Sequence, residues 1–130
     1  MQKLSKGKFQ KKCQELGIGA NQSLFFKKGF LQKFGCSPFC YVHSISTQSQ
    51  TPKQLQSSFR SLCQANKEHL QNATHVLIHL QIDENFPFLA VEKMMEVLHS
   101  HLKDDTDVMM DIQYQKTTSS NVLYCFFEKE

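Results

Sequence analysis

The chain has 130 residues, a length typical of one domain that buries about two thirds of the surface its unfolded form exposes. Its hydrophobic content of 40%, its eleven Phe and its 21% of charged residues exclude a disordered protein and predict a globular one. The net charge of +3 is unevenly distributed, because residues 1–35 contain eight Lys and a single acidic residue, Glu15. We therefore expect a basic helical arm, 1–35, followed by an acidic folded domain, 36–130.

Cysteine and glycine usage bears on the compartment and excludes one class of site. The five Cys are an odd number, and the first residues lack the apolar core of a signal peptide, so we expect reduced thiols and a cytoplasmic protein. No apolar run approaches the ~20 residues that span a bilayer. All five Gly lie at or before Gly35 and are too scattered for a phosphate-binding loop. The sequence predicts no bound nucleotide and no other cofactor.

The arm is predicted to form two short helices. Apolar residues recur at helical spacing within 4–16, and Gly17 stands where a left-handed C-terminal cap belongs. Residues 24–34 carry Phe at helical spacing and predict a second helix, which Gly29 weakens by ~1 kcal/mol relative to Ala. The lysines of the arm either solvate an exposed helix or bind an anionic partner such as nucleic acid or a membrane surface.

The body is predicted to begin with a strand and a helix. Residues 39–46 alternate as a strand, with His43 on one face and Val42 on the other. The run Thr51-Pro-Lys-Gln then supplies a Thr cap, Pro at the first helical position and Gln at the capping-box position. These signals predict a helix that ends near Lys67.

The second half is predicted to add a strand, a helix and two strands. Residues 75–82 alternate so that their even-numbered residues share one face and their odd-numbered residues, His75 and His79 among them, share the other. Asn85 is expected to cap a helix whose apolar stripe is Leu89 or Val91, Met94, Met95, Leu98 and Leu102. Residues 108–114 and 122–127 alternate as strands, and their short link indicates antiparallel directions.

This order of elements predicts a two-layer α+β sandwich. The right-handed crossover rule places both helices on one face of a four-stranded mixed sheet. The other face, to which we assign His43, His75 and His79, is left open by the body and needs a cover. The N-terminal arm, another copy of the chain or a partner protein could supply it.

The predicted order of elements resembles the C-terminal domain of FtsZ, the bacterial tubulin-like cell-division GTPase. The resemblance runs through about residues 21–128. Residues 51–62 resemble the Ala-rich helix of that family, and residues 88–102 its Glu-rich helix. The strand Ala73-Thr-His-Val-Leu-Ile-His-Leu is similar to the family's Gly-Ala-Arg-Gly-Val-Leu-Val-Asn-Ile, and residues 104–111 and 122–127 are similar to its closing segments.

The same resemblance implies that catalysis is lost. The family carries Asn-x-Asp-x-x-Asp before this domain, and its carboxylates activate water at the GTP of the adjacent subunit. Here Asn21 falls on the Asn, while Ser23 and Phe26 fall on the two Asp. Neither residue can act as a carboxylate base. The resemblance therefore implies a non-catalytic chain whose assembly surface would comprise Asn21, Ser23, Phe25, Phe26, Lys27 and Lys28.

Histidine, cysteine and aspartate positions suggest metal sites that the spacing does not support. His75 and His79 lie about 13 Å apart along a strand and cannot share one ion. A His43–His79 pair across adjacent strands is left open by this spacing, whereas a zinc site from Cys36, Cys40 and His43 lacks an evident fourth ligand. The aspartates Asp104, Asp105, Asp107 and Asp111 do not match an EF-hand and indicate a solvated turn. We expect no metal.

Three functions remain open on the sequence. The first is a non-catalytic interaction module that caps or regulates an FtsZ-like filament, or assembles with itself. The second is an adaptor that binds nucleic acid through the basic arm. The third is a small oligomeric enzyme that uses the open sheet face, for which fold is a poor guide.

Overall fold

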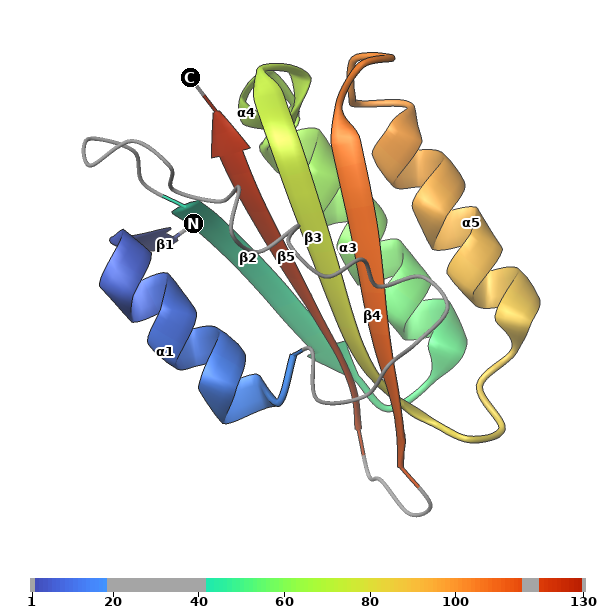
Figure 1. The fold of residues 1–130 in the computed structure, drawn as a ribbon. Coiled ribbons are helices and arrows are strands. Elements are labelled where there is room, and N and C mark those ends of the chain that lie inside the picture. The colour runs from blue at the N-terminus through green and yellow to red at the C-terminus, as the bar shows by residue number, and fades with distance from the viewer. Residues whose placement is uncertain (1, 19–41, 116–119, 130) are drawn as a thin grey trace.

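The protein is a single mixed β-sheet with helices on both faces (Figure 1). The computed structural model describes residues 2–18, 42–115 and 120–129. Within them, no helix is long and apolar enough to cross a membrane. The elements in chain order are β1 (Gln2–Leu4), α1 (Lys6–Leu16), β2 (Val42–Ser49), α3 (Pro52–Ala65), α4 (Lys67–Gln71), β3 (Ala73–Asp83), α5 (Phe88–His99), β4 (Asp107–Gln115) and β5 (Asn121–Lys129).

The sheet has five strands in the order β1-β2-β5-β3-β4. β3 pairs in parallel with β4 and antiparallel with β5, and β2 pairs antiparallel with both β5 and β1. The prediction of four strands is wrong by one edge strand, because the three residues of β1 are too few to show a periodicity. β4 and β5 run antiparallel as expected, but β3 lies between them.

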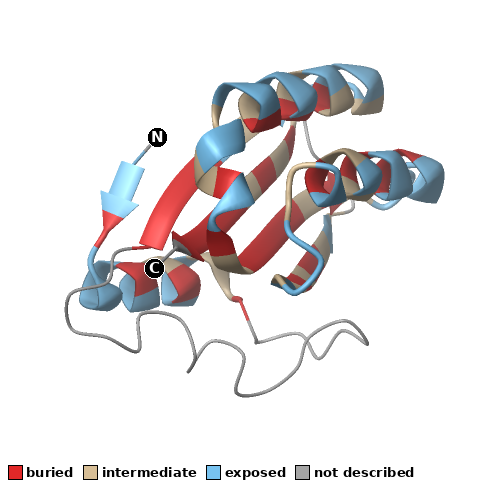
Figure 2. Cartoon of the chain, turned by 90° about the horizontal axis from the view of Figure 1, so that it is seen from above, coloured by how far each residue is buried: buried red, intermediate tan, exposed pale blue. Residues whose placement is uncertain are grey.

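The two crossover helices lie on one face of the sheet, as predicted. α3 and α5 pack there over the larger of two apolar clusters, which includes Leu55, Phe59, Ile78, Met94 and Phe127. Figure 2 shows the strands buried between the two layers of helices. β3 is the most enclosed strand, with residues 76–80 all buried. Burial of such side chains stabilises the fold by about 1.5–3 kcal/mol each.

Local signals in the sequence explain how the two crossover helices begin. The Thr51 side chain accepts a hydrogen bond from the backbone N–H of Gln54 at 3.2 Å, and Pro52 opens α3 as predicted. The expected cap of α5 is wrong, since Pro87 and not Asn85 precedes its first residue. The N–H of Asn85 instead donates to Asp83 at 2.8 Å, which forms the turn after β3.

The odd-numbered face of β3 is covered by the N-terminal helix. α1 packs Phe9 and Cys13 onto Leu77, Met109 and Phe126, which form a second and smaller apolar cluster. Of the three covers considered from the sequence, the arm is the one present in the structure (Figure 1). The proposed boundary at residue 35 and the predicted helix 24–34 lie outside the described residues.

Candidate functional site

The helix α1 is capped at both ends, at its C-terminus by Gly17 as the sequence predicts and at its N-terminus by Ser5, a cap that was not among the predictions. Ser5 caps its N-terminus by accepting from the N–H of Lys8 at 3.4 Å. Gly17 ends it with φ of 70°, a left-handed conformation that Gly adopts without steric cost. The side-chain amide of Gln113 on β4 donates to the carbonyls of Leu16 and Gly17 at 2.8 and 3.2 Å. These contacts fix the end of α1 over β3 and β4.

A buried histidine–aspartate pair lies beneath this cover. His79 of β3 and Asp111 of β4 occupy directly opposed positions of the parallel pair, and neither side chain is exposed. Their Nδ1 and Oδ2 atoms are 2.7 Å apart. A pair this short in an apolar setting is a strong interaction, and removal of one partner leaves the other group buried and uncompensated.

Gln81 completes the environment of His79 on the same strand. Its side-chain nitrogen lies 3.1 Å from Nε2 of His79. When that amide donates, Nε2 accepts, and the proton of a neutral imidazole lies on Nδ1, from which it is donated to Asp111. Tyr124 of β5 lies beside the imidazole with ring centroids 6.1 Å apart, and the Lys12 ammonium is 5.2 Å from the Tyr124 ring centre.

One carboxylate oxygen of Asp111, Oδ1, has no hydrogen-bond partner among the described residues. Burial, and secondarily the charge of Asp111, raise the pKa of the Cys13 thiol to about 12. Cys13 is therefore a protonated thiol at neutral pH and not a nucleophile. The His79–Asp111 pair is thus fully buried beneath α1, and a substrate cannot reach it in this conformation.

His43 is not on the face assigned to it from the sequence. It lies opposite Phe127 of β5 and stacks on that ring at 5.3 Å, on the side of α3 and α5. His69 of α4 is 5.6 Å from it. β2 and β3 do not pair with each other but with β5, so the registers of those two pairings decide which residues of β2 and β3 share a face. These registers cannot be read from a single sequence. The expectation for His43 is wrong, and His43 and His79, on opposite faces, cannot share a metal.

His75 lies on the predicted face but at its rim. Its Nε2 is 3.6 Å from a carboxylate oxygen of Asp107, and its Nδ1 is 3.1 Å from the Thr74 hydroxyl. The described residues contain no group of three potential metal ligands. Cys36 and Cys40 lie outside the described residues. The acidic cluster expected to be a solvated turn is split, since Asp107 is exposed while Asp111 is buried in the core.

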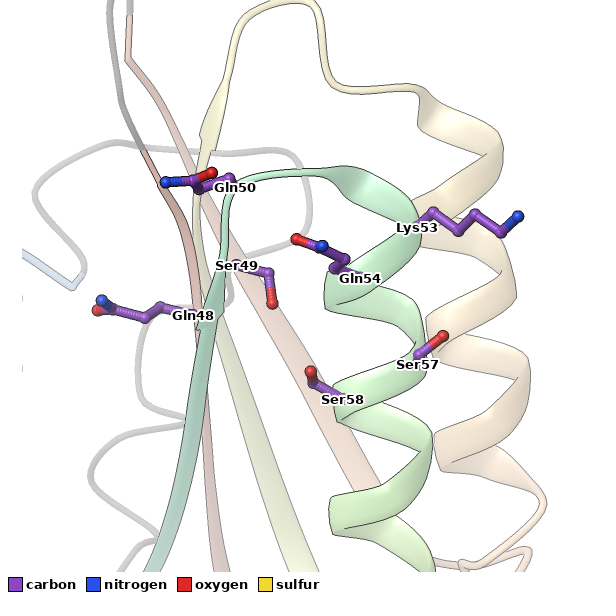
Figure 3. Close-up of a pocket in the computed structure, with 7 residues that line it drawn as sticks. All are labelled: Gln48, Ser49, Gln50, Lys53, Gln54, Ser57 and Ser58. Atoms are coloured by element: carbon purple, nitrogen blue, oxygen red, sulfur yellow. The ribbon is translucent and has the colours of Figure 1, made fainter.

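Surface pockets formed by the described residues lie outside this buried cluster, two of them beside the strands β2 and β4. One, of about 580 Å³, lies between the end of β2 and the start of α3 (Figure 3). Gln54 and Ser58 point toward the strand there, so the pocket presents amides and hydroxyls, and Lys53 is the charged residue of its lining. The other, of about 600 Å³, lies between α5 and the edge strand β4 and is lined by Phe88, Val91, Glu92, Met95, Glu96, His99, Ser100 and Met110.

The residues predicted to form an assembly surface cannot be placed. Asn21, Ser23, Phe25, Phe26, Lys27 and Lys28 all lie outside the described residues. The His79–Asp111 pair is not among the sequence predictions, because its members are 32 residues apart and Asp111 is assigned there to the acidic turn. The available signal was that both residues fall on the odd-numbered face of neighbouring strands.

Comparisons with known proteins locate the fold and not the function. No protein-family model matches the sequence, and no curated protein matches it. An empty FtsZ dimer from M. jannaschii matches with a TM-score of 0.52 and 13% identity over 67% of this chain and 26% of that one. TubZ of Bacillus thuringiensis serovar israelensis, in GDP-form protofilaments, matches with a TM-score of 0.51 and 9% identity over 66% of this chain and 25% of that one.

These similarities establish an FtsZ/tubulin-like fold at the level of chain topology. Identities of 13% and 9% carry no residue-level correspondence. The chain spans about a quarter of the length of these two proteins. The resemblance drawn from the sequence is thus supported for the fold, while activity and partners do not follow from it.

Proposed function

We propose that this chain is a non-catalytic module that binds a subunit of an FtsZ-like filament in the bacterial cytoplasm and caps or regulates the filament. The observation that carries the proposal is the fold, which is similar to parts of two proteins whose structures are those of a dimer and of protofilaments. A domain of that shape is suited to occupy the place of a filament subunit. The contact would run through Asn21, Ser23, Phe25, Phe26, Lys27 and Lys28.

The chemistry of the described residues is consistent with a binding role. The acid–base pair of His79 and Asp111 is fully buried, so substrate does not reach it without displacement of α1. Burial raises the pKa of the Cys63 thiol to about 12 and raises the pKa of the Cys125 thiol well above its usual value, so both thiols are protonated at neutral pH. Outside the described residues, the resemblance drawn from the sequence implies that Ser23 and Phe26 stand where the FtsZ family has carboxylates, and neither side chain can activate a water. A docked copy would therefore leave hydrolysis unassisted.

Co-sedimentation with FtsZ from the same organism, assembled with GTP, tests the proposal. We expect the chain to pellet with the filaments, to shorten them, and to leave the rate of GTP hydrolysis per filament end unstimulated. The variant that replaces Phe25 and Phe26 by Ala and Lys27 and Lys28 by Glu should stay in the supernatant.

A matched control carries the same charge change elsewhere. Lys53 and Arg60 are exposed on α3, so the Lys53→Glu, Arg60→Glu variant should pellet as the parent chain does. If the parent chain stays in the supernatant at FtsZ concentrations well above assembly, the proposal is wrong. Equal pelleting of both variants would reject the assigned contact residues.

A further inference from the structure

The two edges of the sheet differ in length and protection. β4 pairs with β3 along nine residues without a bulge, and its outer side has no strand partner among the described residues. Its sequence, Asp-Val-Met-Met-Asp-Ile-Gln-Tyr-Gln, contains no Pro, and its two charged residues, Asp107 and Asp111, are both acidic, so they do not repel a strand that carries Lys. The opposite edge is β1, a strand of three residues. An edge strand of nine residues without Pro or a bulge, and without a strand partner in the described part of the chain, is a template for a strand of complementary charge.

Apolar surface accompanies the unpaired edge at β4. The groove of about 600 Å³ between α5 and β4 has Val91, Met95 and Met110 in its lining and Glu92 and Glu96 at exposed positions. Phe88 is 57% exposed in the same groove, and Tyr114 near the end of β4 is 59% exposed. Large apolar side chains that line a groove beside an open strand are typical of strand-addition sites.

The two edges carry opposite charge. Around β4 and α5 the exposed acidic residues are Glu92, Glu96, Asp104, Asp105 and Asp107, against Lys93 and Lys103. We call this the acidic edge. Around β1 and α1 the exposed lysines are Lys3, Lys6, Lys8 and Lys11, against Glu15. We call this the basic edge. Figure 1 shows the two at opposite ends of the sheet.

We infer that the acidic edge of one copy docks against the basic edge of a second copy, which extends the sheet from molecule to molecule. The charges match on both faces of such a sheet. Lys3 lies opposite His43 and so shares the face of α5, where Glu92 and Glu96 stand. Asp107 lies on the same sheet face as His79 and Asp111, which is the face that α1 covers. The remaining lysines of the basic edge lie on α1. Because the contact is heterologous, it builds an open chain and not a closed dimer.

This inference goes beyond the proposed function and does not rest on it. Self-association through the sheet edges requires no FtsZ, and binding to FtsZ through residues 21–28 requires no self-association. It also gives the lysines of α1 a protein partner in place of nucleic acid. The two proposals therefore fail independently.

Sedimentation velocity of the chain alone is the first test. We expect species larger than a monomer whose proportion rises with protein concentration at about 0.05 M salt and falls at about 1 M, where the Debye length is ~3 Å. A monomer at every concentration and salt would overturn the inference. A salt-sensitive shift of duplex DNA by a chain that is itself monomeric would overturn it in favour of nucleic-acid binding.

A charge exchange identifies the surfaces. One variant carries Glu92→Lys, Glu96→Lys and Asp107→Lys, and the other carries Lys3→Glu, Lys6→Glu and Lys8→Glu. Each alone should associate roughly tenfold or more weakly than the parent, because like charges then meet at the contact. An equimolar mixture should associate again, because both edges of the first variant are then basic and both edges of the second are acidic.

The Lys53→Glu, Arg60→Glu variant on α3 is the matched control and should associate as the parent does. Circular dichroism of each variant confirms that it is folded. If the mixture remains monomeric while both variants are folded, the inference is wrong. A closed dimer that the lysine reversals leave intact would also overturn it, because it would indicate pairing of two β4 strands about a two-fold axis.

Discussion

The two faces of the sheet are covered in different ways. On one face, α3 and α5 enclose a large cluster in which Phe59, Leu55 and Ile78 are fully buried. On the other face, α1 covers a smaller cluster that surrounds the His79–Asp111 pair. The first face is a larger, mainly apolar core in which His43 stacks on Phe127, whereas the second combines a smaller apolar cluster with the buried polar pair. From this difference we expect the first face to contribute most of the stability of the domain, and α1 to detach at a lower free-energy cost than α3 or α5.

Truncation of one Phe on each face measures that difference most directly. Phe59→Ala should destabilise the domain by about 3–5 kcal/mol, since it leaves a cavity under α3 that the sheet cannot fill. Phe9→Ala, on α1, should cost about 3 kcal/mol or less, because a terminal helix can shift toward the sheet. Urea unfolding followed by circular dichroism gives both values. A Phe9→Ala variant less stable than Phe59→Ala would contradict the assignment of the main core.

The buried pair provides the next largest effect. Asp111→Ala should cost about 3 kcal/mol, because it leaves the His79 imidazole buried with Gln81 as its remaining described partner. The double substitution His79→Leu, Asp111→Leu removes both polar groups and should restore stability to about the parent value. Urea unfolding of the three proteins tests this. If the double variant is as unstable as Asp111→Ala, the His79–Asp111 interaction stabilises the fold by more than the cost of burying its two polar groups.

The end of α1 is expected to be sensitive to a single methyl group. At Gly17, with φ of 70°, a Cβ atom would lie 3.2 Å from the amide nitrogen of Gln113. Gly17→Ala should therefore cost about 1–2 kcal/mol and should loosen α1 before the sheet. Hydrogen exchange resolves the order, with faster exchange in α1 and unchanged exchange in β3. Ala in place of the exposed Gly7, which has no neighbour within 4 Å, is the control and should not destabilise the protein.

The fold was largely predictable because its signals are local. The Thr51-Pro52 start of α3, the Gly17 cap of α1 and the alternation in β3 each depend on residues close in sequence. The crossover rule then placed α3 and α5 on one face. The three-residue β1 was missed because its place depends on pairing with β2, about 40 residues away, as Lys3 opposite His43 illustrates.

The site was less predictable because it depends on which strands become neighbours. His79 and Asp111 meet only when β3 and β4 pair in parallel at the observed register. The prediction for His43 is wrong because its face depends on how β2 pairs with β5, and no residue near β2 in the sequence indicates that pairing. Residues 21–28, selected through a family resemblance, are outside the described residues, so their role stays a prediction. Periodicity identifies the faces of a strand but not which face a distant strand shares.

The buried thiols are expected to have the smallest effect on the unfolding free energy at neutral pH. The rates at which they are chemically labelled distinguish the two faces of the sheet. The pKa of Cys13 under α1 and that of Cys63 under α3 are both raised from 9.0 to about 12, mainly by burial. Because the folded pKa is the higher one, the stabilisation is complete below pH 9.0 and is lost as pH rises toward about 12. A pH titration of the unfolding free energy should therefore be flat near pH 7 and fall above pH 9.0.

Thiol labelling at pH 8 should modify Cys13 before Cys63, because α1 is expected to detach more readily than α3. Equal labelling rates, limited by global unfolding, would show that α1 and the main core open as one unit.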